Sequence, residues 1–442
     1  MWRINRKLSS SQIIILGFAA VILLGSLLLM LPFSTRDGRG AAFSDALFTA
    51  VSAVWVTGLV VQDTATYWSG FGQAVLLLMI QIGGMGVITF AVVLSTAAGQ
   101  RISLRQRGIM QEAISAPKLG GIVRLTGFII TATAALELLG AAALAPVFCQ
   151  RLGLLKGLWY GLFHSVSAFC NAGFDLMGVD TPYSSLTAFS SHPAVNLVVM
   201  VLIISGGIGF MTWDDLKTNR LQFRRYRMQT KVVLVTSGLL LALPAIYFYL
   251  FEFAGLEAGD RFWGSLFQSV TARTAGFNTI DFNQMTEGGL GIMLILMLTG
   301  GAPGSTAGGM KVTTLAVMVS TAFAAFRRRG DTHFFGRRID EGTVRSAMAI
   351  LTLYLALFFS GGLLISRLEG LPLLACLFET ASAVGTVGVT LGITPQLGLA
   401  SRCILIFLMY SGRVGALTLV FAALSEGKGN GARLPKEKLM VG

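Results

Sequence analysis

The chain has 442 residues, of which 54% are hydrophobic and only 12% are charged, and its mean hydropathy is +0.72. Soluble domains carry about 25% charged residues, so this composition excludes a soluble globular protein and indicates a polytopic membrane protein. The formal net charge of +13 is gathered in clusters between apolar segments, which argues against a nucleic-acid surface.

The distribution of the basic residues predicts the topology. The basic clusters lie at 1–7, 101–107, 217–231, 326–338 and 436–438, and the connections between them are poorer in Lys and Arg. Cytoplasmic loops are enriched in these residues, so both termini and the basic loops are expected in the cytoplasm. The first apolar segment, 11–33, is long enough to span and lacks a convincing cleavage site. The sequence therefore predicts a multi-pass protein of the cytoplasmic (inner) membrane that contacts membrane lipid and no nucleic acid.

A Leu-Phe phrase occurs four times along the chain. Its copies begin at Leu47, Leu162, Leu266 and Leu377, and each reaches a glycine 10 or 11 residues later. Each copy has about ten residues of helix-compatible sequence, too short to cross a bilayer, and lies between two apolar spans. The pattern predicts an all-α polytopic membrane protein with four covalently linked helix–pore-loop–helix repeats around one central pore.

The four repeats are expected at 11–100, 119–215, 230–326 and 343–425, followed by a cytoplasmic tail at 426–442. A second glycine phrase marks the later span of each repeat: IGGMG (82–86), SGGIG (205–209), TGGAPG (299–304) and SGRVG (411–415). Close helix packing would explain these glycines alone. It would not explain why the phrase follows each Leu-Phe copy.

After each pore helix the chain must turn back at membrane depth. Non-helical backbone is tolerated there only where it lines a watery path or is buried in protein. Glycine permits the torsions, and four such strands can present carbonyl oxygens that replace the hydration shell of a cation. The expected filter residues are Val56, Thr57, Gly58, Asn171, Ala172, Gly173, Thr274, Ala275, Gly276, Thr386, Val387 and Gly388. The potassium ion is expected at Thr57, Asn171, Thr274 and Thr386.

These motifs resemble the Trk/Ktr/HKT family of potassium uptake proteins, and most of all its Ktr membrane (ion-conducting) subunit. The resemblance runs from residue 11 to about 425 and rests on the four filter phrases, the stretch GGAPGSTAGG and an arginine in the last span. It implies potassium uptake by a homodimer, with one pore in each chain. It also implies a ring of cytoplasmic nucleotide-binding regulatory subunits.

The resemblance implies K⁺ as the transported ion and no organic cofactor on this chain. A sodium-conducting relative with the same pore is the alternative, and in plant relatives a serine at the first filter glycine marks sodium transport. Gly58 therefore favours potassium. A second filter glycine, as in potassium channels, is missing from each strand, so looser discrimination against Na⁺ is expected. No nucleophile is paired with a base, so an enzyme is not expected. A non-conducting anchor remains the alternative from another class, and four intact glycine strands argue against it.

The third repeat is interrupted within its second span. The interrupting residues, called the gate loop below, are Gly300, Gly301, Ala302, Pro303, Gly304, Ser305, Thr306, Ala307, Gly308 and Gly309. Pro303 removes a backbone donor and the glycines remove side-chain restraint, so the helix is expected to break here. In the family that the chain resembles, this segment is an intramembrane gate. A passive hinge is the alternative, whereas a nucleotide-binding P-loop is excluded because Met310 and Lys311 follow Gly309.

Several charged and polar residues fall within apolar segments. Arg413 is expected near the level of the gate loop, where it would bond the loop's carbonyls, with a salt bridge to Glu379 or Glu137 as the alternative. Arg273, just before its filter strand, is expected to clamp an outer acid such as Asp281. A polar residue lies two positions after the leucine of each Leu-Phe copy and is expected to support the filter backbone: Thr49, His164, Gln268 and Glu379. An exposed patch for the regulatory ring is expected from Trp213, Tyr226, Phe334 and Phe335.

Overall fold

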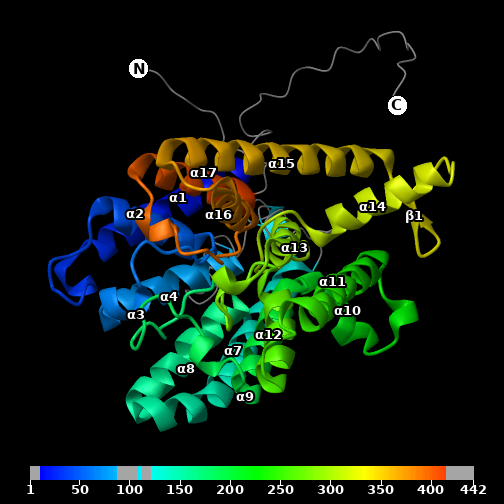
Figure 1. The fold of residues 1–442 in the computed structure, drawn as a ribbon. Helices are drawn as coiled ribbons and strands as arrows, with labels where there is room; N and C mark the ends of the chain where they lie inside the picture. Colours follow the sequence, from blue (N-terminus) through cyan, green and yellow to red (C-terminus); the bar gives the residue numbers. More distant parts are fainter. Residues whose placement is uncertain (1–9, 87–106, 109, 112–120, 415–442) are drawn as a thin grey trace, which may run out of the picture.

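The computed structural model describes residues 10–86, 107, 108, 110, 111 and 121–414 (Figure 1). The predictions for the two termini, for the tail at 426–442 and for most of the loop 101–118 lie outside the described residues. The described chain is mostly helical. Its only paired strands are the hairpin of β1 (His333–Phe334) and β2 (Arg337–Arg338).

Four helices in the described residues are each long and apolar enough to cross a membrane, and each opens one repeat. They are α1 (Ser10–Leu29), α7 (Ile122–Leu152), α11 (Met228–Tyr247) and α15 (Glu341–Glu369). Large apolar side chains on their outer faces are exposed, among them Leu24 at 62% and Leu139 at 67%. Such apolar faces suit contact with lipid. The backbone of these helices can also lie in lipid, because a helix satisfies its own hydrogen bonds.

The Leu-Phe copies form four shorter helices, as the sequence predicts. These pore helices are α2 (Phe43–Val54), α8 (Leu154–Phe169), α12 (Ala258–Thr271) and α16 (Leu373–Gly385). The phenylalanine of every copy is fully buried: Phe48, Phe163, Phe267 and Phe378. A large buried aromatic ring contributes on the order of 2–3 kcal/mol by burial, which explains why the phrase recurs.

The second helix of each repeat reaches its glycine phrase. These helices are α4 (Gly70–Met85), α9 (Pro193–Gly207), α13 (Glu287–Leu298) and α17 (Leu399–Val414). After α9 the chain bends by 97° into α10 (Phe210–Asn219). After α13 it breaks and resumes as α14 (Val312–Phe326), at the place where the sequence predicts an interruption.

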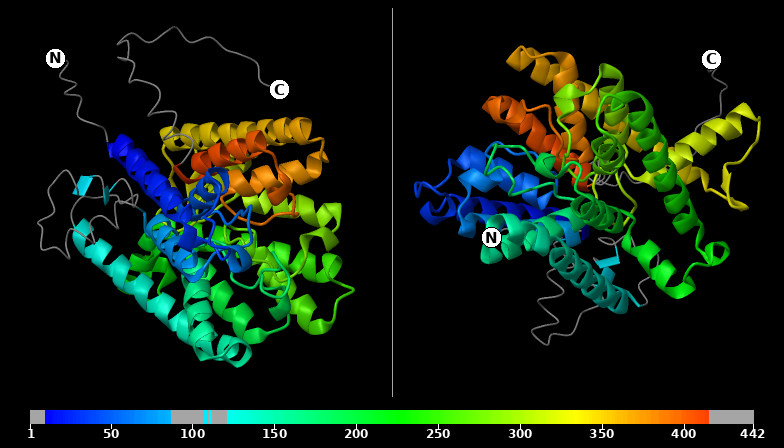
Figure 2. Two further views of the ribbon diagram at one scale, coloured as in Figure 1. Left: turned by 90° about the vertical axis from the view of Figure 1, so that its left-hand side faces the viewer. Right: turned by 60° about the horizontal axis from the view of Figure 1, so that its bottom comes forward.

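The repeats close into a ring. The second helix of each repeat packs against the pore helix of the next, in the pairs α4 with α8, α9 with α12, α13 with α16, and α17 with α2. The last pair joins the fourth repeat to the first, and Figure 2 shows these two ends of the described chain, blue and orange-red, side by side. The fourfold arrangement around one centre is therefore present in a single chain.

Candidate functional site: a four-strand filter and the loop beneath it

The four filter glycines meet at the centre of the ring. A Cβ atom placed on Gly58 would lie 2.5 Å from the Ala172 carbonyl oxygen and 3.2 Å from Gly173 Cα. The same test places Gly173 against Gly276, Gly276 against Gly388, and Gly388 against Gly58. The four backbones therefore crowd around one axis, with no room for a side chain at any of the four positions.

The backbone of each filter strand has the same unusual conformation. The residue two before the glycine has a positive φ in every strand: Val56 (56°), Asn171 (59°), Thr274 (68°) and Thr386 (52°). Residues other than glycine rarely adopt this region, and its recurrence at equivalent positions is typical of a functional site. Val56, rather than Thr57, is thus the equivalent of Asn171, Thr274 and Thr386.

Hydroxyl groups of the pore helices hold the filter strands. Ser52 Oγ accepts a hydrogen bond of 3.1 Å from Gly58 N, and Ser382 Oγ accepts one of 2.9 Å from Gly388 N. In the second repeat, Ser167 Oγ donates to the Phe174 carbonyl at 2.7 Å. These hydroxyls, and Thr271 in the third repeat, stand five residues after the leucine of each copy. Their constant position in the four copies is the sequence signal that marks them.

The polar residues two positions after the leucine support the chain that leaves the filter. His164 Nε2 accepts from Leu176 N at 3.2 Å, and Gln268 Nε2 donates to the Ile280 carbonyl at 3.1 Å. Glu379 accepts from Leu391 N at 3.3 Å and from Thr394 Oγ1 at 2.7 Å. The bonds to backbone groups reach three or four residues beyond the glycine, whereas Thr49 Oγ1 has no partner among the described residues.

The gate loop lies between α13 and α14 and is bonded at both ends. At its base, Gly300 N donates to the Met310 carbonyl at 2.7 Å, and Val312 N donates to the Gly301 carbonyl at 3.1 Å. Farther along, Ala302 N and Thr306 N donate to the carbonyls of Gly207 and Gly206 at 2.9 and 3.2 Å. The glycine phrase of the second repeat therefore supplies backbone acceptors for the loop.

The gate loop contacts the filter directly. Thr306 Oγ1 donates to the Phe169 carbonyl at 3.0 Å and lies 3.2 Å from the side-chain amide of Asn171. A Cβ atom on Gly308 would collide with Thr386 Oγ1. Asn171 and Thr386 each begin a filter strand, so the loop covers one end of the filter.

Arg413 reaches the gate loop from the fourth repeat. One of its terminal nitrogens donates to the Thr306 carbonyl and the other to the Gly83 carbonyl of the first repeat. The predicted bond to a loop carbonyl is present. Among the described residues no salt bridge joins Arg413 to Glu137 or Glu379. Glu137 instead accepts from Gln81 Nε2 at 3.2 Å, and Glu379 is bonded as described above.

Arg273 does not clamp an outer acid. None of the five salt bridges among the described residues includes Arg273 or Arg413. Asp281 instead accepts from Asn283 N at 3.0 Å within its own turn. The expectation failed because Asp281 lies beyond the filter glycine, whereas the Arg273 side chain is directed to the side of the gate loop, where it contacts Gly300.

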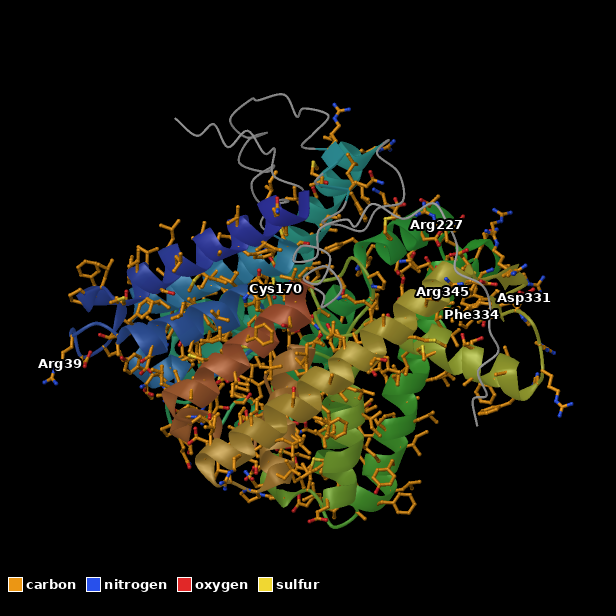
Figure 3. The ribbon with its side chains drawn as sticks, turned by 90° about the horizontal axis from the view of Figure 1, so that it is seen from above. Arg39, Cys170, Arg227, Asp331, Phe334 and Arg345 are labelled. Carbon is orange, nitrogen blue, oxygen red and sulfur yellow. The ribbon has the colours of Figure 1, made fainter. Side chains whose placement is uncertain are left out.

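One end of the molecule carries the basic connections. Figure 3 shows Arg227, Asp331, Phe334 and Arg345 gathered at this end, Arg39 at the opposite end, and Cys170, which precedes Asn171, in the interior.

The aromatic residues expected at this basic end do not form one patch. Tyr226 is buried and Trp213 Nε1 donates to the Ser205 carbonyl at 3.0 Å, whereas Phe335 is 50% exposed. Phe335 instead packs against Phe223, with ring centroids 6.1 Å apart.

Comparisons with known proteins agree with this architecture. The sequence model of the TrkH family, described as a cation transport protein, matches residues 5–429. The Ktr system potassium uptake protein B of Bacillus subtilis is 38% identical over 442 residues, covering 99% of this chain and 97% of that protein. The potassium/sodium uptake protein NtpJ of Enterococcus hirae is 38% identical over 451 residues, covering 100% of this chain and 99% of that protein.

A solved structure shares the fold. The potassium transporter TrkH of Vibrio parahaemolyticus matches with a TM-score of 0.73 at 20% identity, over 96% of this chain and 87% of that chain. At this identity the match shows the fold alone, whereas the sequence comparisons establish the family to which the chain belongs. This is a family of transporters rather than of enzymes, and the resemblance drawn from the sequence is confirmed. The chain belongs to the TrkH family of cation transport proteins.

Proposed function

We propose that the chain takes up potassium across the cytoplasmic membrane, as the ion-conducting subunit of a larger system. The observation that carries the proposal is the closed ring of Gly58, Gly173, Gly276 and Gly388, which places four backbone strands around one axis. The relatives from Bacillus subtilis and Enterococcus hirae are both named as potassium uptake proteins. The fourfold ring supplies what such a function needs, a narrow path lined by carbonyl oxygens.

The transported K⁺ would bind within the filter strands 56–58, 171–173, 274–276 and 386–388. Four sets of carbonyls replace its water shell, with Val56, Asn171, Thr274 and Thr386 at the equivalent positions of the four strands and Thr57 one residue after Val56. The Thr57 and Thr386 hydroxyls are buried and have no partner among the described residues, which suits an oxygen-lined passage. The C-terminal ends of the four pore helices add partial negative charge. No organic cofactor is needed on this chain.

Sodium is the less favoured ion. The name of the Enterococcus relative includes sodium. Against this, all four filter positions are glycine, and the close contacts among them suit a tight carbonyl ring. Potassium sheds its water at lower cost than sodium, so a ring of backbone oxygens favours it.

The gate loop, together with Arg413, would close the path below the filter. Two observations support this role: the loop touches both Asn171 and Thr386, and Arg413 ties Thr306 to Gly83 in another repeat. The guanidinium also places a positive charge on the ion's route, which raises the barrier to leakage. Flux begins when these bonds break and the loop moves aside.

The chain would work as a homodimer on a cytoplasmic ring of nucleotide-binding regulatory subunits. The word "system" in the relatives' names supports a multicomponent assembly. The end that carries Arg227, Phe334 and Arg345 would face the cytoplasm with both termini, following the positive-inside pattern.

Growth and flux test this function. Expression in a bacterium that lacks its own potassium uptake should restore growth on low potassium, with and without added sodium. Purified protein in liposomes should then carry K⁺ down its gradient in preference to Na⁺. Growth rescue that needs sodium, together with Na⁺ flux equal to K⁺ flux, would support the sodium alternative instead.

A further inference from the structure

Arg273 breaks the fourfold symmetry of the filter. It is the residue just before the left-handed position of its strand, and the equivalent positions in the other repeats hold Trp55, Cys170 and Gly385. Only the third repeat places a charge there, and the third repeat is also the one whose second helix is broken.

Among the described residues, the guanidinium of Arg273 has hydrogen bonds to neutral oxygens and no salt bridge. Its Nη2 lies 3.2 Å from Ser237 Oγ on α11 and 3.4 Å from the Gly300 carbonyl of the gate loop. Its Nε is buried and has no partner among the described residues. A cavity of about 30 Å³, lined in part by Asn171, Arg273 and Gly301, lies beside it and has room for a single water molecule.

The residue that Arg273 contacts is the base of the gate loop. Gly300 is where the two ends of the loop cross, since its N–H donates to the Met310 carbonyl at 2.7 Å and a Cβ on Gly300 would collide with the Gly308 carbonyl. Arg413 holds the same loop at Thr306, in its middle. Besides its bonds to the second repeat, the loop is thus held by two arginines, by Arg413 from the fourth repeat and by Arg273 from the filter strand of its own repeat.

We propose that Arg273 is a second latch on the gate, a positioning residue that holds Gly300 against filter strand 274–276 in the closed state. The inference rests on the proposed gate. A hydrogen bond from a charged donor is stronger than a neutral one, and it is stronger still away from water. When the loop moves away from the filter, the buried guanidinium of Arg273 keeps only Ser237 as a hydrogen-bond acceptor. Loss of an acceptor by a buried cation costs free energy, so the open state is disfavoured. Arg273 therefore raises the free energy of opening and couples it to the filter.

A purely structural role for Arg273 makes different predictions. If it only supported filter strand 274–276, its loss would lower K⁺ over Na⁺ preference and reduce flux. If it is a latch, its loss raises flux and leaves the preference unchanged. If Arg273 is a latch, it has no closed gate to stabilise once the loop is shortened. Replacing Arg273 in the shortened protein should then not change the flux further.

The test is flux through the full-length protein in liposomes, normalised to the amount inserted. The proteins are wild type, Arg273→Gln, Arg273→Lys, Arg413→Ala, a deletion of 304–308, and Arg273→Gln combined with that deletion. Arg273→Gln should raise K⁺ flux about three- to tenfold, the range for an ordinary hydrogen bond, because 3.4 Å is long for a bond from a charged donor. Its K⁺ over Na⁺ preference should equal that of wild type, and it should add nothing in the deletion background.

The outcomes separate the latch from the gate. If Arg413→Ala and the deletion raise flux but Arg273→Gln does not, the latch is wrong and the gate stands. If none of the three raises flux, the gate itself is wrong. Equal effects of Arg273→Gln with and without the deletion would overturn the latch in favour of a direct effect of charge on the ion. Should Arg273→Gln fail to insert, Arg273→Lys decides: it keeps the charge but shortens the reach to Gly300, so wild-type flux from it overturns the proposal.

Discussion

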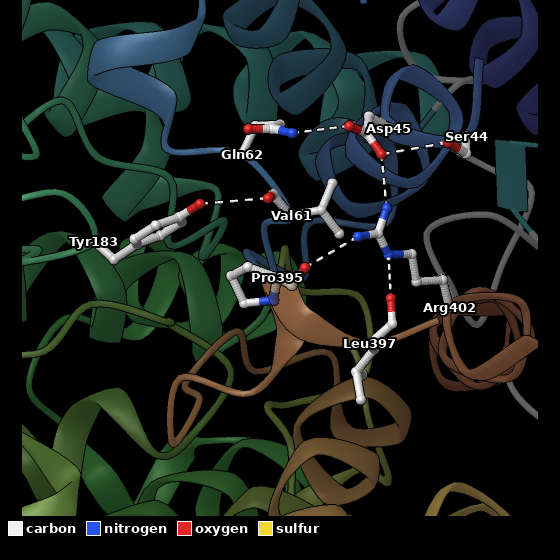
Figure 4. Close-up of polar contacts among 8 residues, drawn as sticks. All are labelled: Ser44, Asp45, Val61, Gln62, Tyr183, Pro395, Leu397 and Arg402. Atoms are coloured by element: carbon white, nitrogen blue, oxygen red, sulfur yellow. Dashed lines mark hydrogen bonds and ion pairs between the residues drawn. The ribbon is translucent and has the colours of Figure 1, made fainter. Parts of the chain in front are cut away.

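Arg402 and Asp45 form a salt bridge of 2.7 Å although 357 residues separate them in the sequence. Figure 4 shows the Arg402 guanidinium also donating to the carbonyls of Leu397 and Pro395, at 2.8 and 3.1 Å. Gln62 Nε2 donates to the second Asp45 oxygen at 2.9 Å. The side chains are only 18% and 14% exposed, so this network joins the first and last repeats where no peptide bond does.

Breaking this pair should loosen the ring. Arg402→Leu leaves Asp45 partly buried without its cation, and we expect a loss of about 1–3 kcal/mol of stability, together with weaker K⁺ over Na⁺ preference. Thermal unfolding in detergent and ion competition in liposomes measure the two effects. Charge reversal at both positions, Asp45→Arg with Arg402→Asp, should recover part of the stability, and Arg345→Leu is the control because that arginine is exposed. Full stability in Arg402→Leu would show that the pair contributes nothing to closure.

Gly58 should not tolerate a side chain. A Cβ there would lie 2.5 Å from the Ala172 carbonyl oxygen, so Gly58→Ser or Gly58→Asp must displace a neighbouring filter strand. We expect K⁺ over Na⁺ preference to fall about tenfold, equivalent to about 1.4 kcal/mol, before folding is lost. Uptake of both ions by the variants provides the measurement. Gly127→Ser on α7 is the control because its Cβ would meet no atom within 4 Å. Unchanged preference in Gly58→Asp would contradict the filter assignment.

Shortening the gate loop and removing Arg413, which holds the loop, should both raise ion flux. Deletion of 304–308 removes the part of the loop that covers Asn171 and Thr386, and Arg413→Ala removes the donor to the Thr306 carbonyl. Both should raise flux per inserted protein, by about tenfold or more for Arg413→Ala if one charged hydrogen bond is lost. Each variant should also depend less on the regulatory partner. A passive hinge predicts misfolding or slower flux from the deletion, and a deletion protein that inserts normally but conducts no faster would exclude the gate.

The docking surface should centre on Phe223 and Phe335 rather than on Trp213 and Tyr226. Phe223 and Phe335 are 41% and 50% exposed, and the Lys231 ammonium lies 5.8 and 5.7 Å from their ring centroids. Alanine at both phenylalanines should reduce co-purification of a cytoplasmic nucleotide-binding ring with the membrane protein. Phe359→Ala on α15, which removes an exposed aromatic ring from a membrane-spanning helix, should leave co-purification unchanged. Equal recovery of the ring from all variants would place the docking surface elsewhere.

Sequence patterns predicted the fold because its signals are local. The Leu-Phe copies, the glycine after each copy and the break at 300–309 all lie within short windows. The structure shows them as short helices, as four glycines that meet at one centre, and as an interrupted helix. The contacts of single charges could not be predicted in the same way. Arg273 was expected to meet Asp281, eight residues away in the sequence, yet its partners are Ser237 and Gly300, because the packing of repeats decides where a long side chain can reach.

The same reason explains the misplaced aromatic patch. Trp213 and Tyr226 lie in a basic, polar connection and were expected to be exposed. In the fold, the Trp213 indole N–H donates to the Ser205 carbonyl and the Tyr226 hydroxyl donates to the Arg220 carbonyl. Both rings are therefore turned inward. No periodicity marks such contacts in advance.

The packing of α17 against α2 has a consequence for biosynthesis. Ribosomes release the first repeat long before the fourth, so the face of α2 that α17 covers has no partner during most of translation. Until then the first filter strand has carbonyls without neighbours at membrane depth, where lipid offers no hydrogen bonds. The nascent chain must keep its early pore helices away from lipid, at the membrane surface or against the insertion machinery, until α16 and α17 emerge. A ribosome stalled after the third repeat would therefore hold a chain that is inserted but has no finished pore.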